Sequence, residues 1–108
     1  MAGNDVVYVR LSLVKPRAGN DERVGKMEDD LMRFLASQPG YLHGYRITGG
    51  DSEQGRLGRV TFWRSDHDAD HAAQTDHVLA IRSELLLIIE DGEHVEGSWV
   101  AQAYEPSS

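Results

Sequence analysis

The chemically capable side chains of this sequence gather between Arg59 and His77. Trp63 ends an apolar stretch there, and its indole N–H could donate a hydrogen bond to a carbonyl or a phenolate. His77 carries an imidazole that can accept a proton near neutral pH. His67 and His71 are spaced i, i+4, which on a helix can chelate a metal ion, but the sequence implies no third ligand. We therefore expect no metal site.

Each of these side chains also has a purely structural interpretation. Trp63 could be a core aromatic at a strand end, and His77 could be a half-exposed histidine at a helix start. His67 is expected to face solvent on an acidic helix start. His71 precedes Val78 by two helical turns, so it could reach a buried pocket if the helix is continuous.

Two sets of side chains could supply the rest of a pocket, because alternate residues of a strand share one face. The first set is Arg59, Thr61 and Trp63, and the second is Tyr41, His43 and Tyr45. If the two faces coincide, they form a cavity with an aromatic floor, a guanidinium for anions and phenolic donors. That composition suits a flat polar aromatic ligand. Alternatively, His43 and Tyr45 line an interface between two copies of the chain.

Four strands and two helical regions must position these residues. Apolar alternation predicts strands over 6–14, 41–48, 56–64 and 94–104, and apolar stripes predict helices over 21–38 and 66–90. Pro39-Gly40 ends the first helix, and Ser65 is a candidate N-cap of the second. Thr75 could begin a new cap, so we expect a break near Gln74.

The element order βαββαβ predicts a four-stranded antiparallel sheet with both helices on one face, the ferredoxin-like α+β fold. We expect one domain over residues 1–108, with a core at about 6–104 and a tail at 105–108. The sheet face away from the helices would carry many apolar and aromatic residues. Two such sheets packed together would bury both faces, so we expect a homodimer.

Composition excludes several classes of function. The formal net charge is −7, and the basic residues are scattered, which argues against nucleic acid and anionic membranes as partners. There is no cysteine, so disulfides and thiolate chemistry are excluded. The N-terminus has no signal-peptide pattern, and the longest aliphatic run, 85–89, is far too short to span a bilayer. We expect a soluble, cytoplasmic protein.

Three short motifs carry a resemblance to a known family. They are Gln38-Pro39-Gly40-Tyr41, Phe62-Trp63-Arg64-Ser65 and Thr75-Asp76-His77-Val78. Together they resemble the antibiotic biosynthesis monooxygenase domain family, whose members are dimeric α+β barrels, over about Val6 to Tyr104. Two positions depart from the family pattern: Thr61 stands where an acidic residue is frequent, and Ala72 where a histidine is frequent, with His71 one place early.

The resemblance implies cofactor-independent oxygenation in some members, haem degradation in others and no known chemistry in many. The leading hypothesis is therefore a monooxygenase, without cofactor, of a small aromatic or quinol-type metabolite. His77 would be the base, Trp63 and Tyr45 would shape the pocket, and Arg59 would stabilise oxyanion charge. One alternative is a non-catalytic binding or structural dimer, favoured by the two departures. The other is haem binding through His77 or His71.

Overall fold

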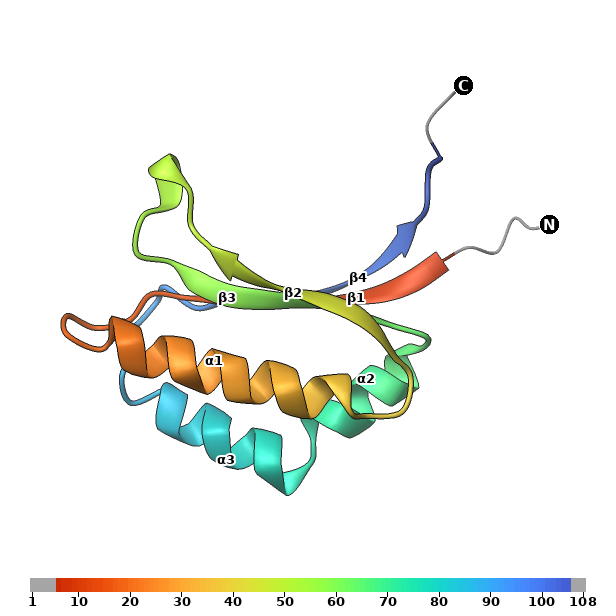
Figure 1. Ribbon diagram of the computed structural model, residues 1–108, viewed down its shortest axis with the longest axis horizontal. Coiled ribbons are helices and arrows are strands. Elements are labelled where there is room, and N and C mark those ends of the chain that lie inside the picture. The colour runs from red at the N-terminus through yellow and green to blue at the C-terminus, as the bar shows by residue number, and fades with distance from the viewer. Residues whose placement is uncertain (1–5, 106–108) are drawn as a thin grey trace.

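The computed structural model describes residues 6–105 (Figure 1). The strands are β1 (Val6–Val14), β2 (Tyr41–Thr48), β3 (Leu57–Trp63) and β4 (Val95–Gln102). The helices are α1 (Asp21–Ala36), α2 (Asp66–Ala73) and α3 (Asp76–Leu85), and a short 3-10 helix, η1 (Asp51–Glu53), lies between β2 and β3. Residues 106–108 of the predicted tail lie outside this range, as do residues 1–5.

The four strands form one antiparallel sheet in the order β2-β3-β1-β4. Figure 1 shows α1, α2 and α3 on the same side of this sheet. Within residues 6–105, no helix or strand covers the opposite side. The ferredoxin-like α+β fold predicted from the element order is confirmed.

Two side-chain caps begin the second and third helices. Ser65 Oγ accepts a hydrogen bond from the backbone N–H of Asp68 at 3.0 Å. Thr75 Oγ1 accepts one from the backbone N–H of Val78 at 3.4 Å. Such caps satisfy amide groups that have no partner inside the helix. The second cap starts a new helix, so the break predicted near Gln74 is confirmed.

The last helical region is shorter than its apolar pattern predicts. α3 ends at Leu85, and the chain then turns so that Ile89 forms an isolated antiparallel bridge with Pro16. Ile89 is buried there beside Val14. The aliphatic run 85–89 therefore spans the end of α3 and the turn that follows it. Its apolar pattern is the same as that of a longer helix, so periodicity alone does not locate the end of α3. In the described part of the chain, no helix is long and apolar enough to cross a membrane.

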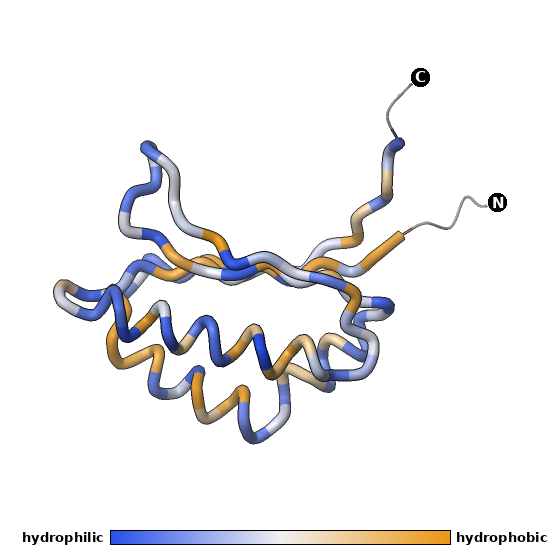
Figure 2. Tube along the Cα trace, in the orientation of Figure 1, coloured by the Kyte–Doolittle hydropathy of each residue, from blue (hydrophilic) through white to orange (hydrophobic). Residues whose placement is uncertain are grey.

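The core lies between α1, α3 and the sheet. Figure 2 shows apolar segments alternating with hydrophilic ones along α1 and α3. One cluster surrounds Trp63, and a second joins Val14 to Val24 and Leu85. The other buried apolar residues of these clusters are Leu31, Leu35, Ala69, Ala72, Val78, Ile81 and Ile89.

The middle of the sheet face toward the helices is polar, whereas Val14 and Trp63 on the same face are buried in the core. On β1, Arg10 and Ser12 lie opposite Thr61 and Arg59 of β3, and Arg10 reaches carboxylates on α2. The alternate residues of the same two strands therefore face away from the helices. They pair as Val9 with Phe62, Leu11 with Val60, and Leu13 with Gly58.

A bulge in β2 separates Tyr41 from His43. Tyr41 lies opposite Trp63, whereas His43 lies opposite Phe62, so the two side chains point to different faces. Gly44 follows the bulge, and a Cβ there would lie 2.8 Å from the Tyr41 hydroxyl and 2.9 Å from the Val60 carbonyl oxygen. Glycine is therefore the residue that this close approach permits.

Candidate functional site

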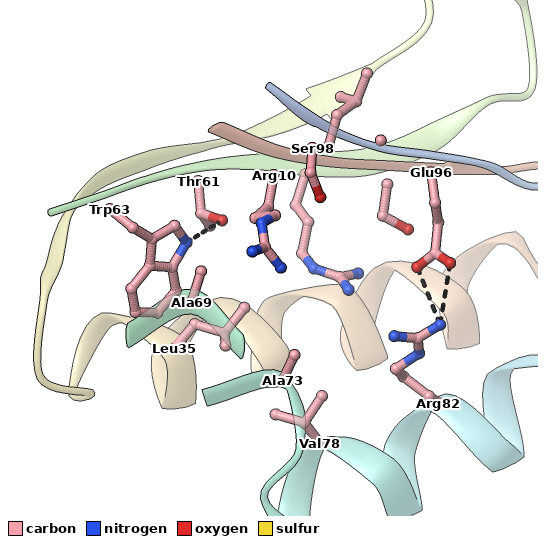
Figure 3. A pocket seen from close by; sticks show the side chains of 14 residues that line it. Arg10, Leu35, Thr61, Trp63, Ala69, Ala73, Val78, Arg82, Glu96 and Ser98 are labelled. Atoms are coloured by element: carbon pink, nitrogen blue, oxygen red, sulfur yellow. Dashed lines mark hydrogen bonds and ion pairs between the residues drawn. The ribbon is translucent and has the colours of Figure 1, made fainter. Parts of the chain in front are cut away.

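A cavity of about 320 Å³ lies between the sheet and the helices (Figure 3). Its sheet side is lined by Arg10, Leu11, Ser12, Arg59, Thr61, Trp63, Glu96, Gly97 and Ser98. Its helical side is lined by Leu35, Ala69, Ala73, Val78 and Arg82. Three guanidinium groups, one carboxylate and several hydroxyls thus share a space with aliphatic and aromatic walls. This volume lies at the small end of the range of about 300–1,000 Å³ that is typical of ligand pockets.

Arg10 of β1 reaches across the cavity to α2. Its guanidinium lies 3.1 Å from a carboxylate oxygen of Asp66 and 2.9 Å from one of Asp70. Burial lowers the pKa of Arg10, but hydrogen bonds and charge attraction from these two carboxylates outweigh it and hold the pKa above its ordinary value. Its Nε is buried and has no hydrogen-bond partner within the described residues. Arg10 is therefore a permanent cation, and one of its N–H groups has no acceptor among the described residues.

Arg59 of β3 makes a buried ion pair with α1. Its Nη1 lies 2.8 Å from Oε1 of Glu28, whose side chain is completely buried. The other carboxylate oxygen of Glu28 has no partner among residues 6–105. A buried carboxylate requires a cation close by, because its desolvation is costly. Arg59 therefore neutralises a core charge and presents the rest of its guanidinium to the cavity.

The indole of Trp63 forms one end of the cavity. Its Nε1 donates to Thr61 Oγ1 at 2.8 Å, and both side chains are buried (Figure 3). Tyr41 packs edge-on against the ring at a centroid distance of 5.5 Å. The indole N–H is thus already satisfied within the protein. Trp63 offers a ligand its aromatic surface rather than the hydrogen bond expected from the sequence.

A second ion pair joins α3 to the edge strand β4. Arg82 Nη2 lies 3.1 Å from Oε1 and 3.0 Å from Oε2 of Glu96 (Figure 3). Both side chains are about one-third to two-fifths exposed, so the pair lies where the cavity meets solvent. It connects the helical layer to the sheet across the opening.

The histidines predicted to act in the pocket lie outside it. His77 stacks on Phe34 of α1 at a centroid distance of 4.3 Å, and its Nε2 lies 3.7 Å from Asp30. Its neighbour Val78 lines the cavity instead. His71 is exposed on α2. Because the helix breaks between α2 and α3, His71 does not share a helical face with the buried Val78. His67 is exposed as expected.

The two β2 residues predicted to bind substrate lie on the other face of the sheet. His43 packs against Phe62 and Tyr45, at centroid distances of 5.2 Å and 5.0 Å. Phe62 points away from the helices, so His43 and Tyr45 do so as well. The bulge after Tyr41 is the physical reason, since it shifts the alternation of β2 by one position. Of the predicted pocket set, Arg59, Thr61 and Trp63 come together, and His43 and Tyr45 do not join them.

Several residues that line the cavity were not predicted from the sequence. Arg10 and Ser12 are the polar residues of an alternating apolar and polar strand pattern. The apolar residues of such a pattern are normally assigned to the core and the polar ones to solvent. Glu96 and Ser98 carry the same signal in the last strand. Arg82 shares a helix with Val78 at i, i+4, which places both on one face.

The residues present do not fit a metal ion or a haem. Among residues 6–105, no group of three or more His, Asp or Glu side chains is placed to hold a metal ion. A haem would need an axial ligand in the cavity, and the described lining contains no histidine, tyrosine or methionine. His71 and His77, the candidate ligands, do not line it.

The fold and its lined cavity define a ferredoxin-like α+β domain with a polar pocket between sheet and helices. Solved structures of this architecture match nearly the whole chain. SnoaB, a cofactor-independent oxygenase from Streptomyces nogalater, matches in a mutant form with a TM-score of 0.76 and 16% identity, over 95% of this chain and 99% of that chain. Rv0793 from Mycobacterium tuberculosis matches with a TM-score of 0.75 and 15% identity, over 94% and 99% of the two chains.

A protein of Nitrosomonas europaea, provisionally assigned as an antibiotic biosynthesis monooxygenase, matches with a TM-score of 0.76 and 13% identity, over 100% of this chain and 98% of that chain. No protein-family model matches the sequence, and no curated protein matches it. At these identities the matches establish the fold. The resemblance to antibiotic biosynthesis monooxygenases is thereby confirmed as a structural one.

Proposed function

We propose that this protein oxygenates a small aromatic or quinol-type metabolite with dioxygen and without a cofactor. The observation that carries the proposal is the polar, tryptophan-walled cavity inside this particular fold. The same fold is found in SnoaB, which is named as a cofactor-independent oxygenase. The charged and polar side chains that line the cavity would give a polar ligand hydrogen-bonding and charged contacts.

The cavity offers a binding mode for an ionised aromatic. The ring would pack on Trp63 and the aliphatic wall, where apolar contact provides most of the affinity. An anionic oxygen would accept from the guanidinium of Arg10 or of Arg59, both of which line the cavity. Both arginines remain charged, so they favour the substrate anion, which is the electron-rich form that can reduce dioxygen.

The overall reaction can be written for anthrone as a test substrate. Its methylene carbon loses two hydrogens and gains one oxygen atom from dioxygen, and the second oxygen atom leaves as water. The four electrons removed from carbon are those that dioxygen accepts. The protein must therefore provide binding, anion stabilisation and a proton acceptor, and no external reductant is consumed.

We further propose that the chain works as a homodimer joined through the outer face of the sheet. That face carries Val9, Leu11, Val60 and Phe62 at its centre. Around them Tyr45, Val95 and Trp99 are 55%, 44% and 52% exposed in the single chain. A contiguous apolar face of this kind marks an interaction site. His43 and Tyr45 would then contribute to the interface, the alternative that the sequence left open.

A second candidate function is ligand binding without turnover. It is favoured by the pairing of every lining arginine with a carboxylate and by the position of His77 outside the cavity. Arginine cannot accept a proton at ordinary pH, so the cavity's cations cannot act as the base. Under this alternative, the protein would bind an aromatic anion but leave it unchanged.

Oxygen uptake with anthrone separates the two candidates. The wild-type protein should consume dioxygen faster than buffer, and R10Q, which replaces the guanidinium with a shorter neutral amide, should reduce kcat/KM about tenfold or more. R17Q is the matched control, because Arg17 is a half-exposed arginine paired with Asp91 outside the cavity. Anthrone binding without oxygen uptake would support the second candidate, and equal rates in R10Q and wild type would contradict the role of Arg10.

A further inference from the structure

The imidazole of His94 contacts a residue that lines the cavity. His94, just before β4, places its Nε2 3.2 Å from the hydroxyl oxygen of Ser12 on β1. Ser12 is 5% exposed and lines the cavity. The two residues are 82 positions apart in the sequence, and the antiparallel pairing of β1 with β4 brings them together. A hydroxyl that faces the ligand space is thus hydrogen-bonded directly to a histidine.

One carboxylate lies close to this histidine. Its Nε2 lies 3.6 Å from Oε2 of Glu96, which also lines the cavity. Glu96 is shared with Arg82 of α3, whereas the neighbouring Glu93 is held by Arg56 at 2.6 Å. Across the sheet, Arg59 lies opposite Ser12 but is paired with Glu28. Glu96 is therefore the charge that faces the imidazole most directly.

We propose that the pocket takes a phenol or enol whose hydroxyl lies against Ser12, and that its proton passes through Ser12 to His94. The ligand proton moves to Ser12 Oγ, while the serine's own proton moves to His94 Nε2. No bond between heavy atoms changes, and the ligand becomes an anion beside Arg10 and Arg59. This inference rests on the proposed function, because it supplies the proton acceptor that an oxygenation of this kind requires.

The chemistry of the cavity wall favours this route over its alternatives. A serine hydroxyl alone is too weak a base to hold a proton at neutral pH, whereas imidazole titrates in that range. When the neutral ring carries its proton on Nδ1, Nε2 is free to accept from Ser12. The imidazolium that results lies near the Glu96 carboxylate, which offsets its charge. His94 acts through Ser12, so it is a positioning and proton-holding residue rather than one in contact with the ligand.

A coloured phenol tests the relay without any oxygen chemistry. Alizarin is an already oxidised hydroxyanthraquinone whose absorbance changes when a hydroxyl ionises. Bound to wild-type protein, it should ionise at a lower pH than in buffer. H94Q should raise the ionisation midpoint of the bound dye by about one pH unit or more, a tenfold change in the proton equilibrium. S12A should do the same, S12T should restore the wild-type midpoint, and H77Q should leave it unchanged.

Several results would overturn the inference. They are an unchanged midpoint in H94Q, an equal shift in H77Q, or a failure of the wild-type protein to bind the dye. A second measurement needs no variant: the NMR titration of the His94 ring in the wild-type protein should move when alizarin is added, and a ring that does not respond contradicts the relay. If anthrone is not oxygenated but alizarin ionises as predicted, the monooxygenase proposal is contradicted and the proton relay is supported.

Discussion

The indole N–H of Trp63 is hydrogen-bonded to the hydroxyl of Thr61 at 2.8 Å, and the two side chains are 1% and 3% exposed. They are neighbours on the same face of β3, so the strand itself sets this geometry. The bond fixes the ring as a rigid wall of the cavity. It also explains how a threonine is accommodated where the antibiotic biosynthesis monooxygenase pattern frequently has an acid.

Removing the acceptor from this pair should destabilise the protein. In T61V the shape of the side chain is kept, but the buried indole N–H loses its partner. The free energy of unfolding should fall by about 1–3 kcal/mol, the usual cost of an unsatisfied buried donor. Urea denaturation followed by tryptophan fluorescence measures it. T48V, at an exposed position of β2, is the control and should change stability little. Equal stabilities of T61V and wild type would show that the bond contributes nothing.

The buried pair of Glu28 and Arg59 should behave as a unit. E28Q leaves the guanidinium without its counter-charge and should cost about 3 kcal/mol or more of unfolding free energy. The double variant E28L/R59M removes both charges and should be clearly more stable than E28Q. E22Q, on the exposed side of the same helix, should lie within about 0.5 kcal/mol of wild type. If the cost of E28L/R59M equals the sum of the costs of E28L and R59M measured singly, the coupling is contradicted.

The outer sheet face should hold two copies of the chain together. Sedimentation should give a species of twice the chain mass of 12.0 kDa at micromolar concentration. W99D places a charge on that face and should shift the equilibrium to monomer, because burying an unpaired carboxylate is costly. L87D changes a leucine that is 77% exposed beyond the end of α3 and should leave the dimer intact. A wild-type protein that sediments as a stable monomer rules out the interface.

Tyr41 should make the folded protein sensitive to alkali. Burial raises the pKa of the Tyr41 phenol above its ordinary value. The unfolded chain therefore loses this proton at a lower pH than the folded protein does. The stabilising contribution is present below the unfolded pKa and is lost as pH rises through the folded pKa. Denaturation across the alkaline range should show a smaller loss of stability in Y41F than in wild type, whereas Y104F, at a tyrosine that is 88% exposed, should follow wild type.

The sequence was sufficient for the fold because alternation and helical periodicity are local signals. The strand at Val6–Val14 and the cap at Ser65 were visible in this way. It was also sufficient to bring Arg59, Thr61 and Trp63 onto one face, since they alternate within a single regular strand.

The remaining site residues depend on features that local patterns do not carry. Which sheet face His43 and Tyr45 occupy was left open by the sequence, because it depends on a bulge after Tyr41 that shifts the alternation. The direction of His77 depends on the new cap at Thr75, which resets the helical face. The contact between Ser12 and His94 depends on the register of β1 against β4, which no spacing in the sequence reveals.

Isotope labelling tests the central proposal most directly. Anthrone should be incubated with the protein under ¹⁸O₂, and the product examined by mass spectrometry. The account predicts anthraquinone that carries one heavy oxygen atom, formed faster than in buffer and more slowly with R10Q than with R17Q. Product formed no faster than in buffer, or product whose new oxygen comes from water, would contradict a monooxygenase.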